Sequence, residues 1–389
     1  MAACNIHIPS PLGIGPMSRN TVDAALDQAY AHNSRLMLIA SRRQIEAEPF
    51  GGGYVQGWTT ETFAEYVRER DPDHLVLLCR DHGGPWQHPS ERDAGYDEAA
   101  AIDSSVASFE RDIAAGFDLL HIDTCLEAAA EAEVSDAIAR LLTIYGACWE
   151  LAQRAGRAIA FEVGFERQGA DTDAPEEFRC QVATVMQRLR RSALPSPTFI
   201  VAQTGTKVVA TRNMGGVLSC PRAVLHAVKE LARTCELAGA GLKAHNSDYL
   251  PTDALRSLMS NGVAAINVAP ELGVLESRVF LDILAQARQD RLRDDFLALA
   301  FGSRAWEKWL DAGEDASDFD KAVLAGHYVF ATEEFSEIKR RASVAVGKRH
   351  DSIDDQLRRA VGVRLSQLMS CTNVRTVRRE APNRRKLRA

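Results

Sequence analysis

Short apolar runs alternate with amphipathic segments along the first 270 residues of the chain. The runs have the length of strands and end at polar or turn-forming residues, whereas the segments between them repeat their apolar positions with a helical period. The runs predict strands at Leu12–Met17, Arg35–Ala40, His74–Cys79, Leu119–Asp123, Ala158–Val163, Thr198–Gln203, Gly241–Ala244 and Ala264–Val268. The intervening segments predict helices at Asn20–Ala31, Thr60–Arg70, Asp97–Ala115, Glu127–Ala155, Pro175–Arg191, Pro221–Ala238 and Pro251–Ser260.

Strand and helix alternate eight times, and this order predicts a parallel sheet whose strands are joined by helical crossovers. Eight such units in about 270 residues match the count and length of a closed (β/α)8 barrel, the α/β fold known as the TIM barrel. An open, doubly wound sheet is the alternative, but no GxGxxG motif follows the first strand. We therefore expect residues 1–275 to form a (β/α)8 TIM barrel.

Residues at the ends of the predicted helices support these boundaries. Asn20 and Thr60 are expected as N-caps, because their side chains can accept a hydrogen bond from the first helical turn. Pro221 and Pro251 suit the first turn, where a missing N–H costs little.

The alternation stops beyond residue 275, where only helical patterns follow. They predict helices at Glu276–Asp290, Arg291–Phe301, Ser303–Leu310, Asp318–His327 and Glu333–Ala342. We expect residues 276–370 to form a helical C-terminal extension that packs on the barrel or on a partner subunit. Trp306 and Trp309 have the spacing of a packed aromatic stripe rather than of a cofactor site. Residues 371–389 are rich in arginine and poor in apolar residues, which predicts a basic, disordered tail.

The stretch LVLLCRDHGGP, which contains the third predicted strand, is the clearest indication of chemistry. Its apolar run ends in Asp81 and His82 before two glycines and a proline break the strand. A carboxylate and an imidazole at the end of a buried strand are costly without a partner, and such placement indicates metal binding or proton transfer. The stretch GLKAHNSDYL repeats the pattern with His245 and Asp248. Because the carboxyl ends of barrel strands share one mouth, we expect one common site.

Other polar residues follow predicted strands and belong to the same expected mouth. They are Ser18, Arg19, Ser41 to Gln44, His121, Asp123, Glu162, Glu166, Gln203, Lys207, Asn246 and Asn267. A metal site needs three or four nitrogen or oxygen donors that converge from different elements. His82, His245 and Glu162 are the best candidates, because each ends or directly follows an apolar run. His121 is the rival ligand; it shares a strand face with Asp123, and a buried core histidine is its alternative interpretation.

Asp81 is the candidate acid/base. A carboxylate beside a metal ligand can move the proton of a substrate hydroxyl while the cation polarises a carbonyl. Glu162 or Asp123 could serve in the same role, and Asp81 could instead only orient a ligand imidazole. A metal-independent isomerase that uses Asp81 and Glu162 as a two-base pair is a further possibility.

Composition narrows the classes of protein. At 389 residues and 46% hydrophobic composition, the chain can bury a full core. Its formal net charge of -7 gives no reason to expect a nucleic acid or an anionic membrane as partner. No apolar run approaches the roughly 20 residues that span a bilayer, and the N-terminus lacks the pattern of a secretory signal. The eight cysteines are scattered without a CxxC pair, which predicts free thiols and a cytoplasmic protein.

Seven motifs, taken in order, resemble the family of the tagatose-bisphosphate aldolase non-catalytic-type subunit, a branch of the class II aldolase-like barrels. They are FGGGYVQGWTTETF (Phe50–Phe63), CRDHGGPW (Cys79–Trp86), AGFDLLHID (Ala115–Asp123), EVGF (Glu162–Phe165), VAQTG (Val201–Gly205), KAHNSDY (Lys243–Tyr249) and INVAPEL (Ile266–Leu272). The resemblance covers nearly the whole chain, and the ordered series is more specific than any single motif. It implies a (β/α)8 barrel and a divalent metal, with zinc as the expected ion.

The resemblance also implies roles for individual residues. In class II aldolases the histidine of the DH pair is a metal ligand and the aspartate before it is an acid/base, which corresponds to His82 and Asp81. A second ligand corresponds to His245, and the carboxylate to Glu162. Where active class II aldolases often have a further ligand histidine, this chain has Gln203, and this departure puts ordinary aldolase activity in doubt. Members of this branch resemble sugar C4-epimerases or subunits that stabilise a partner aldolase.

We therefore expect a metal-dependent enzyme that opens and closes the C3–C4 bond of a ketose or ketose phosphate, with C4 epimerisation or C–C cleavage as the outcome. The residues expected to bind this substrate are Gln203, Asn246, Asp248, Asn267, Lys207 and Ser18. The alternative is a non-catalytic subunit that stabilises a separate class II sugar-bisphosphate aldolase through the helical extension. We also expect a homo-oligomer, because barrels of this kind often associate.

Overall fold

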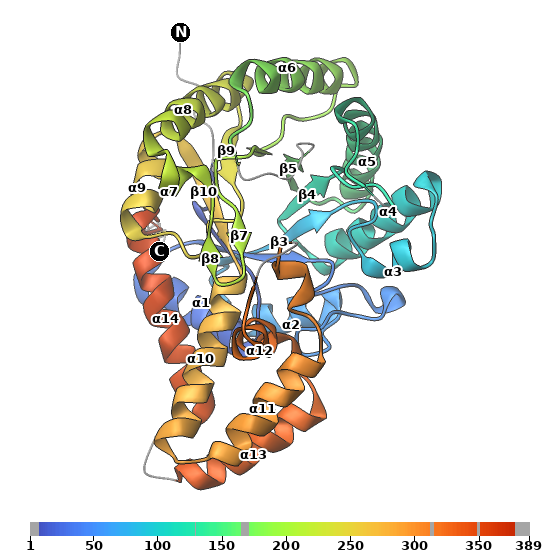
Figure 1. Ribbon diagram of the computed structural model, residues 1–389. Helices are drawn as coiled ribbons and strands as arrows, with labels where there is room; N and C mark the ends of the chain where they lie inside the picture. Colours follow the sequence, from blue (N-terminus) through green and yellow to red (C-terminus); the bar gives the residue numbers. More distant parts are fainter. Residues whose placement is uncertain (1–7, 129, 165–170, 312–314, 348–350, 378–389) are drawn as a thin grey trace, which may run out of the picture.

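The computed structural model describes residues 8–128, 130–164, 171–311, 315–347 and 351–377. At its centre is a closed barrel of parallel strands in the order β1-β10-β9-β6-β5-β4-β3-β2 (Figure 1). These strands are β1 (Leu12–Ile14), β2 (Leu36–Ser41), β3 (Val76–Gly83), β4 (Leu119–Asp123), β5 (Ala160–Gly164), β6 (Phe199–Val201), β9 (Gly241–Ala244) and β10 (Val263–Val268). The predicted (β/α)8 barrel is confirmed.

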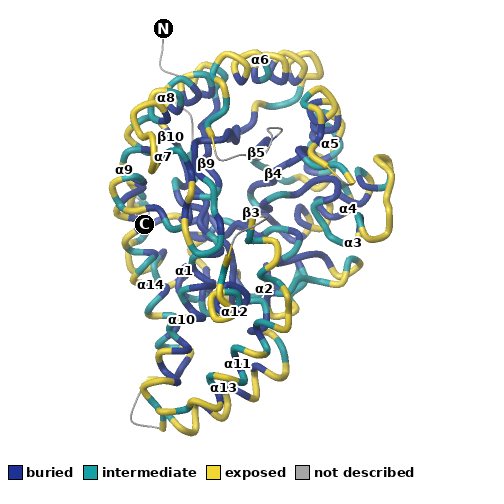
Figure 2. Tube along the Cα trace, in the orientation of Figure 1, coloured by how far each residue is buried: buried dark blue, intermediate teal, exposed yellow. Residues whose placement is uncertain are grey.

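Helices surround the barrel and bury their apolar faces on it. They are α1 (Arg19–His32), α2 (Thr60–Arg70), α3 (Pro89–Asp93), α4 (Glu98–Ala115), α5 (Val134–Arg154), α6 (Pro175–Arg191), α7 (Gly216–Ser219), α8 (Pro221–Ala238) and α9 (Thr252–Ser260). In α8, for example, the buried residues Val224, Val228, Leu231 and Cys235 recur every three or four positions, so that one face meets the sheet. Figure 2 shows the strands buried and the outer helix faces exposed.

Several local boundaries differ from those predicted. Ser18 and Thr59, rather than Asn20 and Thr60, are the N-caps of α1 and α2; the hydroxyl of each accepts the N–H three residues later. Serine, asparagine and threonine are all good capping residues, and only the backbone geometry selects between them. Helix α5, which was predicted to begin at Glu127, begins at Val134. The hairpin of β7 (Val208–Val209) and β8 (Arg212–Asn213), and the short helices α3 and α7, were not predicted.

The C-terminal part is helical, as predicted. It contains α10 (Pro270–Gln286), α11 (Asp290–Gly302), η2 (Glu307–Trp309), α12 (Asp318–Ala325), η3 (Gly326–Val329), α13 (Glu333–Val346) and α14 (Ile353–Cys371). The first of these, α10, starts directly after β10, so the eighth helix of the barrel is also the first helix of the extension. In Figure 1, α11 and α13 lie at its far end, below the barrel. They form a second core there, around Phe280, Phe296 and Phe335.

The last helix, α14, was not predicted, and it returns to the barrel beside α1 and α10 (Figure 1). Its residues Val361, Leu365 and Leu368 are fully buried in the core of the barrel. The first part of the predicted tail then packs on the barrel, because the N–H of Val377 donates to the carbonyl of Asn33 at 2.7 Å. The rest of that tail, residues 378–389, lies outside the described residues.

Within the described ranges, no helix has the length and apolar character needed to cross a membrane. The same ranges contain no disulfide bond between cysteines.

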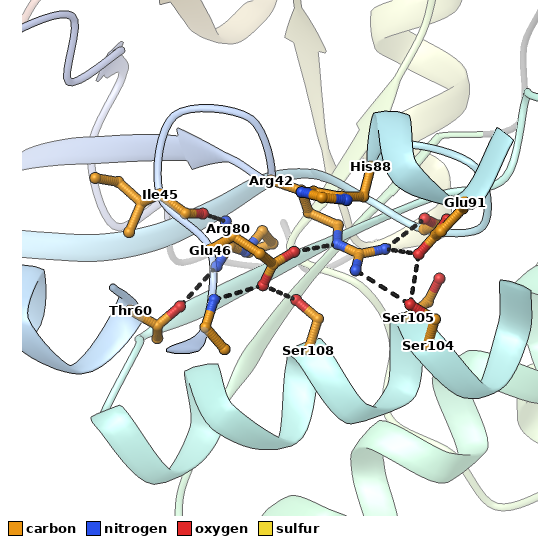
Figure 3. Close-up of polar contacts among 12 residues, drawn as sticks. Arg42, Ile45, Glu46, Thr60, Arg80, His88, Glu91, Ser104, Ser105 and Ser108 are labelled. Atoms are coloured by element: carbon orange, nitrogen blue, oxygen red, sulfur yellow. Dashed lines mark hydrogen bonds and ion pairs between the residues drawn. The ribbon is translucent and has the colours of Figure 1, made fainter. Parts of the chain in front are cut away.

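A network of buried charges holds β2, β3 and α4 together (Figure 3). Arg80, in β3, is 1% exposed, and its guanidinium donates to both carboxylate oxygens of Asp112 in α4, at 2.8 and 2.6 Å. It also donates to two backbone carbonyls, one in β2 and one in the loop after it. Arg42, at the end of β2, binds Glu46 and Glu91 in the same layer. These bonds fix the strand ends on which the candidate site is built.

Replacement of Arg80 with methionine is expected to lower the free energy of unfolding by about 3 kcal/mol, because Asp112 would remain buried without its partner. Denaturant unfolding followed by circular dichroism measures this change. Arg304→Met is the matched control: its ion pair with Glu307 is solvent-exposed, so its removal should cost at most about 1 kcal/mol. The double variant Arg80→Met/Asp112→Leu removes both charges and should recover most of the loss. An Arg80→Met protein as stable as the parent would contradict this account.

Candidate active site and metal centre

A cavity of about 310 Å³ opens at the carboxyl ends of the barrel strands. Side chains from β2, β3 and β4, from the loops after β9 and β10, and from the helical extension line it. Active sites of (β/α)8 barrels lie at this end, and the volume is in the range of small-molecule sites. The predicted residues Asp81, His82, Asp123 and His245 all line this cavity.

Asp81 and His82 both face the cavity although they are neighbours in β3. In a regular strand, adjacent side chains point to opposite faces. The pairing of β3 with β4 shifts between Arg80 and Gly83, where β3 contains one more residue than its partner, and His82 has a left-handed φ of 43°. A bulge of this kind turns a side chain to the other face, and a positive φ at a residue with a side chain is costly. The local backbone therefore brings both functional groups to one side.

The two glycines after His82 permit this arrangement. A Cβ on Gly84 would lie 1.8 Å from the carbonyl oxygen of Asp123 in β4, and a Cβ on Gly83 would lie 2.6 Å from the ring of Phe109. Any other residue at either position would push β3 away from its neighbours. The HGG sequence thus allows His82 to approach β4 closely.

Three imidazole rings converge beside the cavity. The ring centroids of His82 and His121 are 5.2 Å apart, and both lie 5.0 Å from the ring of His245. One donor atom from each ring lies within 4.8 Å of the other two. Nε2 of His121 is buried without a hydrogen-bond partner in the described part of the chain, which is costly unless a ligand satisfies it. Three nitrogen donors from different elements are the protein ligands that catalytic zinc commonly has.

Two aspartates flank these rings. Oδ2 of Asp123 lies 2.5 Å from Nδ1 of His82 and also accepts a hydrogen bond from Gln87 Nε2 at 2.9 Å. Asp81 lies on the other side, with its Oδ2 3.9 Å from Nε2 of His82 and its Oδ1 3.5 Å from Nδ1 of His121. A carboxylate on one ring nitrogen orients the other nitrogen of that ring, as in many metal sites.

Glu162, in β5, is fully buried and has both carboxylate oxygens engaged. Its Oε1 lies 2.8 Å from Nε2 of His245, and its Oε2 lies 2.5 Å from Nζ of Lys243. The structure therefore brings Glu162 to the cluster but engages both of its oxygens, one with the ammonium of Lys243 and one with the imidazole of His245. His121, the rival ligand in the sequence, lies at the centre of the cluster. Two donor sets are compatible with a metal: the three histidines, or Asp81, Glu162, His121 and His245.

The charges of this cluster are coupled. Burial alone would raise the pKa of Asp81, but the nearby histidines hold that pKa well below its usual range. Burial alone would lower the pKa of His82, but Asp81 and Asp123 raise it to about 10. The carboxylates therefore hold positive charge in the cluster at neutral pH. Imidazolium supplies that charge here, and a divalent cation would supply it equally.

Three of the predicted substrate-binding residues line the cavity. Asn267 donates from Nδ2 to Oδ1 of Asp81 at 3.2 Å. Asn246 and Asp248 lie in the loop after β9. The Oδ1 atom of Asp248 accepts the backbone N–H groups of Ala269 and Glu271, each at 2.9 Å, and so fixes the start of α10.

The other three predicted substrate-binding residues do not line this cavity. Gln203 is buried after β6, Lys207 forms an ion pair with Asp311 at 2.7 Å, and Ser18 is occupied as the N-cap of α1. Ser18 faces a separate cavity between α1 and the C-terminal helices, because a capping hydroxyl must point along its own helix. Glu166 lies outside the described residues.

One wall of the cavity was predicted only in part: Arg43 belongs to the expected mouth, but the other four residues were not assigned to it. This wall consists of Arg43, Tyr54, Lys308, Trp309 and Tyr328, of which the last three belong to the helical extension. Trp309 packs against the second core, as expected of an aromatic stripe, and it also lines the cavity and donates from Nε1 to the hydroxyl of Tyr328 at 3.1 Å. No local pattern indicates the complete wall, because its two halves are far apart in the chain and meet only in the folded protein.

No family model and no curated protein matches the chain. Solved structures do. A probable tagatose 6 phosphate kinase from Sinorhizobium meliloti 1021 matches with a TM-score of 0.70 and 18% identity, over 93% of this chain and 100% of that chain. The native fructuronate-tagaturonate epimerase UxaE from Cohnella laeviribosi matches with a TM-score of 0.57 and 12% identity, over 95% and 83%. Fructose-bisphosphate aldolase from Campylobacter jejuni matches with a TM-score of 0.51 and 14% identity, over 94% and 91%. At these identities the likeness shows the fold alone: the chain is a (β/α)8 barrel with a helical extension.

Proposed function

We propose that this protein is a metal-dependent enzyme that acts on a ketose or a ketose derivative by retro-aldol and aldol chemistry. C4 epimerisation or C–C cleavage is the net result. The observation that carries this proposal is the convergence of three imidazoles and the carboxylate of Asp81 beside one cavity of suitable size. A purely stabilising subunit would need neither a cluster of strained and buried charges nor a cavity beside it.

His82, His121 and His245 would hold the metal. Their nitrogen donors suit zinc, and three protein ligands leave a coordination position for substrate. Bound there, the ion would act as a Lewis acid toward the ketone of the substrate. Asp123 orients His82, and Glu162, itself held by Lys243, orients His245. We prefer this ligand set because both oxygens of Glu162 already have nitrogen partners, Nζ of Lys243 and Nε2 of His245.

Asp81 would move the proton. Its carboxylate faces the cavity, and Asn267 holds one of its oxygens, so its position is defined. As the C3–C4 bond of the ketose opens, Asp81 takes the proton of the C4 hydroxyl, C4 becomes an aldehyde carbon, and the electron pair of the bond remains on the enediolate fragment. If the aldehyde rotates before the bond reforms, the enediolate attacks its other face. Asp81 then returns the proton and the C4 epimer results.

The similar folds support a ketose as substrate class. One is named a fructuronate-tagaturonate epimerase and another a fructose-bisphosphate aldolase, and both names describe chemistry on ketose skeletons. Both outcomes in our proposal, epimerisation and cleavage, thus occur on barrels of this shape.

Removal of metal tests the proposal. The purified protein is expected to contain about one divalent ion per chain, and exhaustive chelation should abolish turnover of the active member of a ketose, ketose-phosphate and keturonate panel. Added zinc should restore it. Elemental analysis and chromatography of the sugars measure these outcomes. Turnover that survives in metal-free protein would instead support the two-base pair of Asp81 and Glu162. Absence of turnover together with capture of an aldolase partner would support the stabilising subunit.

A further inference from the structure

The cavity wall that combines Arg43 with residues of the helical extension carries two cations. Arg43 follows β2 in the barrel, and Lys308 lies in η2 of the extension. Tyr54, Trp309 and Tyr328 complete this wall, which we call the cationic wall. It lines the same cavity as Asp81 and His82, so one small molecule can contact both regions.

Among the residues that the structure describes, no carboxylate forms an ion pair with either cation of this wall, and Asp93 acts on Arg43 only through its charge. By contrast, the nearby Arg42, Arg80 and Lys243 are all paired with acids. Lys308 is an exposed residue, and its ammonium lies over the rings of Trp309 and Tyr328, at 4.8 and 4.9 Å from their centroids. Burial of the ammonium and the charge of Arg43 lower the pKa of Lys308 to about 7. An anion between the two side chains would offset both effects.

Both halves of the cationic wall are held in place before any ligand binds. The carbonyl of Arg43 accepts the N–H of Tyr54 at 3.1 Å, and the preceding Arg42 is anchored by its two glutamates (Figure 3). On the extension, the carbonyl of Trp309 accepts the N–H of Ala210, in the β7–β8 turn, at 2.8 Å. Such support reduces the conformational entropy that these side chains lose when a ligand binds.

The wall also borders a second, outer cavity of about 330 Å³. Arg43, Tyr54, Lys308 and Tyr328 line both cavities, and His88 lines the outer one. The two cations therefore lie at the boundary between the site and the outside, where the far end of a substrate would be.

We propose that Arg43 and Lys308 bind an anionic terminal group, a phosphate or a carboxylate, on the substrate of this site. The proposal rests on the proposed function and makes its substrate an anionic ketose. A guanidinium and an ammonium suit either group, because the planar fork of arginine matches both and the lysine adds a point charge. The helical extension thereby selects the substrate, since it supplies Lys308 and the rings around it.

Equilibrium binding tests this separately from the chemistry. Wild-type protein is kept in chelator to prevent turnover and is titrated with a ketohexose 6-phosphate, a ketohexuronate and a neutral ketohexose. At least one of the two anions is expected to bind at least about 10-fold more tightly than the neutral sugar. The anion that does so identifies the terminal group. Equal affinities for charged and neutral sugars, or no measurable binding of either anion, would overturn the proposal.

Variants assign this binding to the cationic wall. Arg43→Met and Lys308→Met should each weaken anion binding by about 10- to 100-fold and leave the affinity for the neutral sugar unchanged. Arg43→Lys keeps the charge and should retain part of the affinity. Lys229→Met, at an exposed position of α8, is the matched control. Circular dichroism melting confirms that each variant is folded. Unchanged anion affinity in both methionine variants would overturn the assignment.

The outcomes for the two proposals are distinguishable. If the anion binds as expected but metal-loaded protein turns over no sugar of the panel, the proposed function fails and the anion subsite stands. If metal-loaded protein turns over the neutral ketose as efficiently as the anionic ones, the function stands and the anion subsite is wrong.

Discussion

Replacing His82 with alanine is expected to remove the proposed metal and to lower turnover by at least about 1000-fold, because the ion would supply several kcal/mol of transition-state stabilisation. His82 contributes one of three convergent imidazoles, and Asp123 orients its ring. Alanine removes that donor and leaves Asp123 without its partner. Elemental analysis gives the metal content, and initial rates on the active sugar give the turnover.

The matched control is His226→Ala, which removes an imidazole from an exposed position of α8. It should change neither quantity. A His82→Ala protein that retains about one metal ion per chain would show that His82 is not a ligand and would leave Asp81, Glu162, His121 and His245 as the donor set.

Replacing Asp81 with asparagine is expected to lower kcat by about 1000-fold while the metal stays bound. Asparagine keeps the shape of the side chain but cannot take the C4 hydroxyl proton. The donors of the three-histidine set are unchanged, so metal content separates this effect from that of His82→Ala. Asp103→Asn, at an exposed position of α4, is the control and should retain full activity.

Two other results would each be informative. Full turnover by Asp81→Asn would indicate that Glu162 or Asp123, both of which lie in the same cluster, is the acid/base. Loss of metal together with turnover would mean that Asp81 holds the metal or orients a ligand, because removal of a proton acceptor alone leaves the ion in place.

The barrel could be predicted because its determinants are local. Each strand is an apolar run and each helix an amphipathic stretch, and eight alternations in about 270 residues match few folds other than the closed barrel. The place of Asp81, His82 and His245 followed from the same rule, since parallel strands bring their carboxyl ends to one mouth.

Features that depend on pairing between distant segments could not be predicted. The amphipathic pattern of α14 does not tell which surface it covers, and only the folded chain places Leu365 in the barrel core. His121 and Glu162 are directly opposite in the register of β4 and β5. The sequence could not tell which of them is the better metal ligand, because that depends on whether other side chains already hydrogen-bond to their donor atoms.

From composition, period and motif order alone, the chain is an α/β barrel with acids and imidazoles at its strand ends, because those features depend on neighbours in sequence. Tertiary structure decided the rest. The extra residue in β3 turns Asp81 and His82 to the same face, and the returning extension sets Lys308 opposite Arg43. Both results depend on contacts between segments that are far apart in the sequence, and only folding brings such segments together.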